Sequence, residues 1–484
     1  MNGFSYHRSG GVYYDGTVNY GAGWSFNTYH VIGIAVDWTN KRAYWHVDGV
    51  WANSADPSAG TGFYDITTNA SNVAASVDAI PAWRTRAATT IEQVSVNFGQ
   101  NPSFGGELTA GTFTDDSGKG LFKYAPPTGF LALCEDNLPT PAIADPGDYM
   151  RTVLYAGDGN SGRSITGVGF QPDLVWLKSR TNNASHRLSD SVRGVNKQLM
   201  SNTTEVEATF TTMLTSFDSD GFALGDNAGI NGSGYTNVAW CWKAGGAAVS
   251  NTDGTITSQV SANQTAGFSI VSYDGSGNVN DTVGHSLGKT PSFIILKART
   301  QAYFWRVYHS HFGTSPTEGL YLNSTVISAV HDEHGGIASV TPTTFGFGTD
   351  GTNTLTGVNK SGDTYIAYCW TEIEGYSKFG SYVGNGSADG PFVYCGFKPA
   401  FLMIKLVTGS QRDWHIYDSS RNPTNPVGLN LRPSSASTDT DEPGIDFLSN
   451  GFKIRSNYVF SNESGQTIIF MAFAESPFQT ANAK

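Results

Sequence analysis

The chain has 484 residues, of which 39% are hydrophobic, 13% aromatic and only 14% charged, and it contains 57 glycines. Its formal net charge of −12 argues against a nucleic-acid partner, because neutralising phosphates requires clustered lysine and arginine. No apolar stretch reaches the roughly 18 residues of a membrane-spanning helix, so we expect no membrane insertion. The length allows roughly three or four domains, and the aromatic, glycine-rich composition favours an all-β fold.

Residues 1–125 are expected to form a first unit built around a β-hairpin. Two apolar stretches, 31–37 and 43–49, flank a polar turn at 39–42. Alternation along the second stretch places Trp45 and Val47 on one face, and Tyr44 and His46 on the other. A further strand is predicted over residues 94–100.

Residues 33–49 and 96–104 resemble the hairpin and the closing strand of the SPRY family. The resemblance implies a partial SPRY-like (concanavalin-like) β-sandwich over residues 1–125. Only about thirty residues precede the hairpin, fewer than a complete SPRY sandwich needs. Four alternatives stay open: a divergent small sandwich, a truncated domain, a start inside a longer gene product, or completion by a neighbouring chain. An unfinished sheet would expose an edge that favours association.

Residues 126–147 contain five prolines and little periodicity. This composition predicts a semi-rigid, Pro-rich connector between the first unit and the rest of the chain.

One short phrase then occurs three times along the chain, at residues 169–178, 287–297 and 396–405. In each copy a glycine and a proline precede four or five apolar residues, and a lysine ends the run. Such a run predicts a strand buried on both faces. We expect the closing lysines Lys178, Lys297 and Lys405 to end their strands in solvent.

A second apolar strand closes each copy, at residues 238–242, 366–370 and 469–473. The spacing predicts three tandem β-sandwich-like repeat domains: repeat 1 (148–246), repeat 2 (266–375) and repeat 3 (376–484). A polar linker, 247–265, would join the first two. The period is too long for a solenoid, so each repeat is expected to hold its own core, like beads along a rod.

Residues 130–246 resemble a repeat found in structural and tail-associated proteins of marine bacteriophages, often beside a SPRY-like domain. The resemblance implies a component of the virion, an extracellular particle, with other virion proteins as partners. It assigns no catalytic residue, and the sequence itself predicts neither a catalytic residue nor a cofactor.

Histidines concentrate in repeat 2, with His309 and His311 on one segment and His331 and His334 on another. Residues i and i+2 of a strand share a face, so the first pair could chelate a transition metal. The alternative is a set of polar loop residues, and no other repeat contains an equivalent cluster.

Four tryptophans in polar surroundings or at strand starts are candidate ligand-binding residues: Trp51, Trp83, Trp305 and Trp414. Carbohydrate sites commonly combine an aromatic platform with polar hydrogen-bonding side chains. Trp305 and Trp414 hold equivalent positions, with Ser185 at that place in repeat 1, and packing between or within domains is the alternative reading for them.

These features together favour a non-enzymatic virion protein, such as a tail fibre or tail-associated adhesin that contacts host surface carbohydrate or protein. Repeated weak modules gain avidity when they engage together. One alternative is a capsid decoration or fibre protein without a host ligand. Another is a glycan-degrading tail enzyme, which would need a pair of facing carboxylates. We expect a homo-oligomer, with a trimer as the candidate state.

Overall fold

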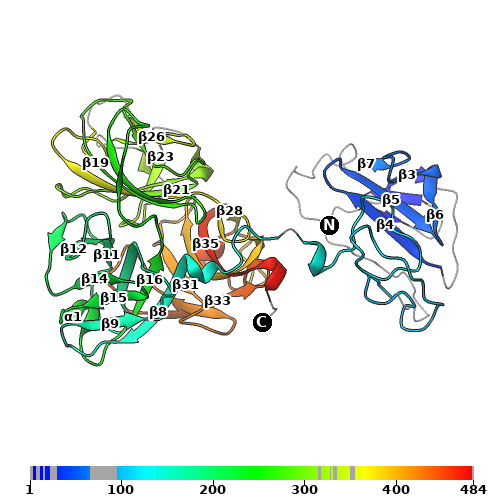
Figure 1. The fold of residues 1–484 in the computed structure, drawn as a ribbon, viewed down its shortest axis with the longest axis horizontal. Coiled ribbons are helices and arrows are strands. Elements are labelled where there is room, and N and C mark those ends of the chain that lie inside the picture. Colours follow the sequence, from blue (N-terminus) through cyan, green and yellow to red (C-terminus); the bar gives the residue numbers. More distant parts are fainter. Residues whose placement is uncertain are drawn as a thin grey trace. The chain divides into compact units, whose positions relative to one another are not determined.

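The computed structural model describes residues 30–65, 95–138, 140–313, 318–326, 329–330, 335–348 and 355–481, with three further strands among residues 4–21. The chain divides into two compact units, unit 1 (Met1–Pro139) and unit 2 (Thr140–Lys484). Antiparallel strands dominate both units, which confirms the all-β prediction (Figure 1). The helical elements described are short: α1 (Ala228–Asn231), α2 (Val459–Asn462), η1 (Ala52–Ser54), η2 (Glu135–Asn137), η3 (Pro146–Asp148), η4 (Ser310–Phe312) and η5 (Phe478–Thr480). Within the described ranges, none is long and apolar enough to cross a membrane.

The predicted hairpin of unit 1 is confirmed. Strands β4 (Ile32–Asp37) and β5 (Arg42–Val47) pair antiparallel, and β6 (Val50–Trp51) and β7 (Tyr64–Asp65) both pair with β5. A separate small sheet precedes them, formed by β1 (Phe4–Tyr6), β2 (Gly11–Tyr14) and β3 (Thr17–Gly21).

The two faces of β5 are also as expected. The ring of Trp45 packs edge-on against Tyr64, whereas His46 on the other face contacts Trp51 and Tyr124. Strand β4 pairs only with β5 among the described strands, and its side chains Ile32, Ile34 and Val36 are exposed. These alternate residues give β4 an exposed apolar face.

The strand predicted over residues 94–100 is not formed in the described residues 95–100. The Asn97 side chain accepts hydrogen bonds from the backbone N–H groups of Gly99 and Asn101, at 2.9 Å each. An asparagine that captures nearby backbone donors favours a turn over a ladder. Residue 94 lies outside the described residues.

The Pro-rich segment 126–147 is not a separate spacer, because each half packs on a different unit. The Asp115 carboxylate of unit 1 accepts hydrogen bonds from the Ala132 N–H and the Asn137 amide, both at 2.7 Å. Beyond the unit boundary, Ile143 is buried in the core of unit 2. Proline content alone could not reveal these contacts.

Unit 2 contains three sandwiches with one common topology. In each, a larger sheet has the same four central strands in the same order: β8-β16-β10-β11, β19-β27-β21-β22 and β28-β35-β30-β31. The facing sheets are β9-β15-β14, β20-β26-β25 and β29-β34-β33-β32. Three copies of one sandwich agree with the three repeats read from the sequence.

The strands of the three repeats have the following bounds. Repeat 1 has β8 (Met150–Ala156), β9 (Arg163–Thr166), β10 (Leu174–Ser179), β11 (Arg187–Asp190), β12 (Lys197–Met200), β13 (Ala208–Thr209), β14 (Leu214–Asp218), β15 (Gly221–Leu224) and β16 (Thr236–Trp242). Repeat 2 has β19 (Phe268–Asp274), β20 (Thr282–Gly284), β21 (Phe293–Ala298), β22 (Arg306–His309), β23 (Glu318–Tyr321), β24 (Ala329–Val330), β25 (Gly336–Val340), β26 (Thr344–Gly348) and β27 (Thr364–Trp370). Repeat 3 has β28 (Ser377–Val383), β29 (Phe392–Tyr394), β30 (Phe397–Leu406), β31 (His415–Asp418), β32 (Val427–Asn430), β33 (Thr440–Leu448), β34 (Gly451–Ile454) and β35 (Thr467–Pro477).

The segment predicted as a polar linker, 247–265, belongs to repeat 2. It forms β17 (Val249–Asn251) and β18 (Ser258–Asn263), which extend the sheet next to β19. The sequence did not predict these strands, because β18 buries Ser258 and Ser261 as well as Val260. Buried serines on a strand do not produce the apolar alternation by which strands are recognised.

The recurrent phrase forms the central strands β10, β21 and β30, and each is buried on both faces as predicted. One face, such as Val175 and Leu177 of β10, lies inside its own sandwich. The other face, including Leu174 and Trp176, lies in a second cluster that all three repeats build. We call this cluster the shared core.

The shared core is rich in aromatic side chains, and Trp242 of repeat 1 lies where all three repeats meet. Its ring centroid is 6.1 Å from Trp370 of repeat 2, and 5.6 Å and 5.9 Å from Phe401 and Phe473 of repeat 3. The repeats are therefore not beads along a rod. They pack face to face as three lobes of one body (Figure 1).

The contacts between the repeats are cyclic. The strand residues opposite Leu174, Phe293 and Phe401 are Asp190, His309 and Asp418. The Asp190 carboxylate accepts a hydrogen bond from the Tyr368 hydroxyl of repeat 2 at 2.7 Å, and His309 Nε2 lies 3.2 Å from the Phe470 carbonyl oxygen of repeat 3. The Asp418 carboxylate accepts one from the Trp240 indole of repeat 1 at 3.0 Å. Repeat 1 thus contacts repeat 2, repeat 2 contacts repeat 3, and repeat 3 closes back on repeat 1.

The expectation that the three phrase lysines end their strands in solvent is wrong. Each is fully buried. Lys297 Nζ donates to the Thr204 carbonyl of repeat 1 at 3.0 Å, and Lys405 Nζ donates to the Thr325 carbonyl of repeat 2 at 3.0 Å. Lys178 Nζ donates to the carbonyls of Ser179 and Asn182 at 2.5 Å and 3.2 Å. The acceptors of Lys297 and Lys405 include carbonyls of the preceding repeat, which the local sequence pattern does not show.

Among the described residues, ion pairs join the repeats at two of their three contacts. Arg299 of repeat 2 binds both oxygens of Glu207 of repeat 1, at 2.9 Å and 3.0 Å, and Arg180 of repeat 1 binds Asp439 of repeat 3 at 2.7 Å. Val407 holds the equivalent position in repeat 3, two residues after Lys405, where it is buried in the shared core. The contact between repeats 2 and 3 therefore has an apolar side chain where the other two have an arginine.

Candidate functional site

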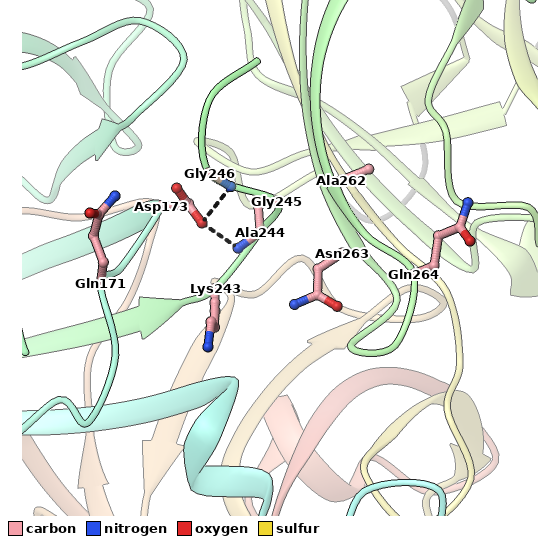
Figure 2. A pocket seen from close by; sticks show the side chains of 9 residues that line it. All are labelled: Gln171, Asp173, Lys243, Ala244, Gly245, Gly246, Ala262, Asn263 and Gln264. Carbon is pink, nitrogen blue, oxygen red and sulfur yellow. Dashed lines mark hydrogen bonds between the residues drawn. The ribbon is translucent and has the colours of Figure 1, made fainter. Parts of the chain in front are cut away.

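A groove lies in unit 2 where repeat 1 leads into repeat 2 (Figure 2). It has a volume of about 620 Å³. Repeat 1 contributes the side chains of Gln171, Asp173 and Lys243, and repeat 2 contributes Asn263 and Gln264. We call it the Lys243 groove.

Asp173 shapes the groove by holding the chain that leaves β16. Its Oδ2 accepts hydrogen bonds from the Ala244 N–H at 2.8 Å and the Gly246 N–H at 3.4 Å, and its Oδ1 accepts one from the Ser191 hydroxyl at 2.8 Å. Burial raises the pKa of this carboxyl, and these hydrogen bonds act against that rise. Figure 2 shows the two backbone contacts. Asp173 is thus occupied by its own repeat.

Lys243 follows the last residue of β16 and is half-buried. Its ammonium group lies over two aromatic rings, 5.7 Å from the centroid of Tyr149 and 5.8 Å from that of Phe170. Stacking of a cation on ring faces fixes the position of the charge without consuming its hydrogen-bond donors. Lys243 therefore presents a placed positive charge to the groove.

The repeat 2 wall is built from the turn after β18. Asn263 Oδ1 accepts a hydrogen bond from the Ala266 N–H at 3.0 Å, which fixes the orientation of the amide. Gln264 Nε2 donates to the Ser286 carbonyl at 2.9 Å. Both amides are held by the fold, so this wall has a defined set of polar atoms.

Sequence reasoning missed this groove. Gln171 and Asp173 are polar positions of the recurrent phrase, where repeat 2 has Thr290 and Ser292. That difference between copies was the available signal. Asn263 and Gln264 lie in the stretch interpreted as a linker, which concealed them.

The candidate tryptophans have different environments. Trp305 and Trp414 are fully buried in the shared core, so neither ring faces a ligand, and the packing alternative is confirmed for both. Their indole N–H groups donate to carbonyls of the preceding repeat, Met200 at 2.8 Å and Tyr321 at 2.9 Å. Trp51 is half-buried against His46, with 4.8 Å between the ring centroids. Trp83 lies outside the described residues.

Strand register corrects the position equivalent to these tryptophans in repeat 1. Leu177 pairs with Arg187, Leu296 with Arg306 and Ile404 with His415. The next residue outward is therefore His186, which matches Trp305 and Trp414, and not Ser185 as expected. His186 is fully buried and accepts a hydrogen bond from the Trp176 indole at 2.9 Å.

The histidine pair His309 and His311 does not share a strand face, because β22 ends at His309 and η4 begins at the next residue. His309 Nδ1 accepts a hydrogen bond from the His311 N–H at 3.0 Å, while its Nε2 faces the Phe470 carbonyl. Both nitrogens of His309 are therefore engaged. His331 and His334 lie outside the described residues, and the described ranges contain no cluster of three or more His, Cys, Asp or Glu that could hold a metal ion.

Comparison with known proteins gave no match among curated proteins and none among solved structures. A family model described as "Domain of unknown function (DUF7483)" matches residues 145–477. This range holds the strands of all three sandwiches and is more than half of the chain. The chain therefore belongs to this family.

Proposed function

We propose that the chain is a non-enzymatic structural protein of a bacteriophage particle that acts as a tail-associated adhesin for host surface glycan or protein. The resemblance of residues 130–246 to a repeat of phage tail-associated proteins supports the location. The three-lobed body of unit 2 supports a binding role.

The observation that carries the proposal is a loop that each repeat presents in the same form. The loop follows β8 in repeat 1, β19 in repeat 2 and β28 in repeat 3. A fully buried asparagine holds it in place: Asn231, Asn359 or Asn462. The side-chain oxygen of that asparagine accepts a backbone N–H from the loop, from Asp158 at 3.2 Å, Ser276 at 2.9 Å or Asn385 at 2.8 Å. A rigid body that displays one loop three times suits multivalent attachment, because it limits the entropy lost on binding.

The loops differ in sequence although their anchors are the same. A glycine precedes each loop: Gly157, Gly275 or Gly384. The loop residues that follow are Asp158-Gly159-Asn160 in repeat 1, Ser276-Gly277-Asn278 in repeat 2 and Asn385-Gly386-Ser387 in repeat 3. Short polar side chains on a fixed backbone are the usual chemistry of loops that bind polar ligands. This pattern favours binding by loops on a constant scaffold.

For unit 1 we assign an attachment role within the particle. The exposed side chains Ile32, Ile34 and Val36 along β4 give an apolar edge of the kind that pairs with another chain. The neighbour would be another virion protein or a second copy of this chain.

The test is to locate the chain on purified particles by immunogold electron microscopy and to measure adsorption to host cells in the presence of the purified chain. We expect label at the tail and reduced adsorption. Label on the capsid wall without competition would support the decoration alternative instead. Loss of host polysaccharide during incubation with the purified chain would support the glycan-degrading alternative and overturn the proposal.

A further inference from the structure

We infer that the Lys243 groove is a binding site for an acidic saccharide, a sugar chain that carries carboxylates, and this inference rests on the proposed function as a glycan adhesin. It specifies the chemistry of the ligand and the part of unit 2 that contacts it.

The side chains that line the groove carry three free donor groups, besides the amide oxygens of Gln171 and Gln264. In the part of the chain that the structure describes, the Lys243 ammonium, the Gln171 amide and the Asn263 Nδ2 have no hydrogen-bond acceptor within bonding distance. The acceptor of Asn263, by contrast, is already engaged by the Ala266 N–H. Three donors from two repeats therefore face one hollow.

The acidic group of the groove does not neutralise this donor set. Both Asp173 oxygens are occupied by backbone N–H groups and the Ser191 hydroxyl, and no ion pair joins Asp173 to Lys243 among the described residues. Lys243 instead rests over Tyr149 and Phe170. The Lys243 ammonium still attracts the Asp173 carboxyl through space, but its hydrogen-bond donors stay free for an incoming ligand.

The walls are pre-formed, which favours recognition of a polar ligand. A Cβ on Gly245 would lie 2.5 Å from the Ala262 carbonyl oxygen, so the two repeats touch at backbone distance behind the groove. Since Asn263 and the chain at 244–246 are held by hydrogen bonds of the fold, binding would order few side chains.

A carboxylate-bearing sugar fits this set better than the other polar ligands. One cation matches one carboxylate, and charged hydrogen bonds of this type are the strongest available to the groove. The amide donors of Gln171 and Asn263 match ring and hydroxyl oxygens beside the carboxylate. A phosphate would be served better by several clustered cations or a forked arginine, and the groove has neither.

The experiment titrates the full chain with an oligomer of galacturonic acid and, separately, with the neutral galactose oligomer of the same length, using isothermal calorimetry at low salt. We expect the acidic oligomer to bind more tightly than the neutral one. Lys243→Gln keeps a donor and removes the charge, so it should weaken acidic binding by about tenfold or more and leave neutral binding unchanged. Asn263→Asp, which keeps the oxygen that accepts the Ala266 N–H, should also weaken acidic binding.

The matched control is Lys360→Gln, since Lys360 is a lysine of repeat 2 whose side chain is 44% exposed and which does not line the groove. It should bind the acidic oligomer as the natural chain does. Near-ultraviolet circular dichroism checks that each variant is folded. If the natural chain binds neither oligomer, or if Lys243→Gln binds the acidic oligomer as the natural chain does, the inference is overturned.

Adsorption to host cells separates this inference from the proposed function. If the natural chain and the Lys243→Gln chain compete equally well for adsorption, the adhesin function stands and the groove is not its ligand site. If oligogalacturonate binding depends on Lys243 while the chain does not compete for adsorption, the groove assignment stands and the adhesin proposal falls.

Discussion

Three lysine ammonium groups lie inside unit 2, and each has two backbone carbonyls as acceptors. Burial lowers the pKa of Lys178 to about 8, that of Lys297 to about 7 and that of Lys405 to about 8. Burying a cation is unfavourable unless it is well paired. These lysines should therefore make the stability of the protein depend on pH near neutrality.

We predict that the free energy of unfolding rises as the pH is raised from about 7 to about 8.5, with a slope of up to about 1.4 kcal/mol per pH unit for each such lysine. The unfolded chain holds these protons up to the ordinary lysine pKa of 10.5, while the folded chain releases them near 7 or 8. Raising the pH through this window therefore favours the folded state. Urea unfolding at several pH values measures the slope.

The window excludes the buried histidines, which act in the same direction at lower pH, and the buried cysteines, which act in the opposite direction at higher pH. The pKa values of His46, His309 and His415 are lowered by burial to about 4, so their contribution is lost only as the pH falls below the ordinary histidine pKa of 6.5. Burial raises the pKa of the Cys241 and Cys369 thiols, and their ionisation in the unfolded chain acts against folding above about pH 9.

Lys297→Met should reduce the slope, and Lys360→Met should not. Equal slopes in the two variants would contradict the prediction.

A second residue-scale prediction concerns Asp418, which is fully buried and binds Arg421 at 2.6 Å as well as the Trp240 indole. Asp418→Ala should lower the free energy of unfolding by about 3–5 kcal/mol, because it leaves the buried Arg421 guanidinium with Asp439 as its remaining acid and the buried Trp240 indole N–H without its acceptor. Asp389→Ala, which removes an exposed partner of Lys453, should change stability little. Thermal unfolding of both variants measures the difference, and comparable losses would refute it.

At this scale the sequence shows which residues are unusual but not what they contact. The lysines of the recurrent phrase, and Trp305 and Trp414, are visible in the repeats. Their partners are carbonyls such as those of Thr204, Met200 and Tyr321, about 80 to 105 residues earlier in the chain. A backbone carbonyl has no residue-type signature, so no reading of one sequence could identify these acceptors.

At the scale of elements, the loop after the first strand of each repeat needs glycine at one position. A Cβ on Gly157, Gly275 or Gly384 would lie 2.1 to 2.3 Å from a backbone carbonyl oxygen of the asparagine-bearing turn. The same close approach in three copies explains why a glycine recurs at this position of each repeat.

Gly275→Ala should therefore lower the free energy of unfolding by about 1–3 kcal/mol, because the backbone at Lys360 must move to admit the methyl group. Gly229→Ala in α1 is the control, since its nearest neighbour would be a side-chain oxygen at 3.1 Å, and we expect a much smaller effect. Urea unfolding compares them. If the Gly275→Ala chain is as stable as the Gly229→Ala chain, the backbone at Lys360 can move at no cost and the prediction is wrong.

Elements with a strong apolar run were predictable, and elements with polar sequences were not. Leu174–Lys178 and its copies were recognised as doubly buried strands because four or five apolar residues are bounded by turn chemistry. Strands β17 and β18 were missed because serine and asparagine fill their buried positions. Asn263 and Gln264, which form one wall of the Lys243 groove, lie in that same stretch, so the groove was missed for the same reason.

At the scale of the whole molecule, the cyclic contacts make the three repeats interdependent. A chain that ends at residue 375 would lose Phe401 and Phe473 from around Trp242, and Asp418 from the Trp240 indole. We predict that it aggregates or binds a hydrophobic dye, whereas residues 140–484 alone unfold in a single cooperative transition as a monomer. Light scattering and calorimetry test both. A shortened chain that stays monomeric and melts sharply would mean that the repeats are independent.

The closure of repeat 3 on repeat 1 has a consequence for how the protein is made. Arg180 and Asp439, which bind each other, are separated by 259 positions in the chain. During synthesis, the contact between Arg180 and Asp439 can form only after repeat 3 has left the ribosome. This delays the contact by on the order of ten to fifty seconds at typical rates of translation. Until residues 401–473 have been synthesised, Trp240 and Trp242 lack their repeat 3 partners, so the nascent chain exposes an aromatic surface. A cell that produces this protein in quantity therefore relies on its chaperones to keep the growing chains apart until the ring of contacts is complete.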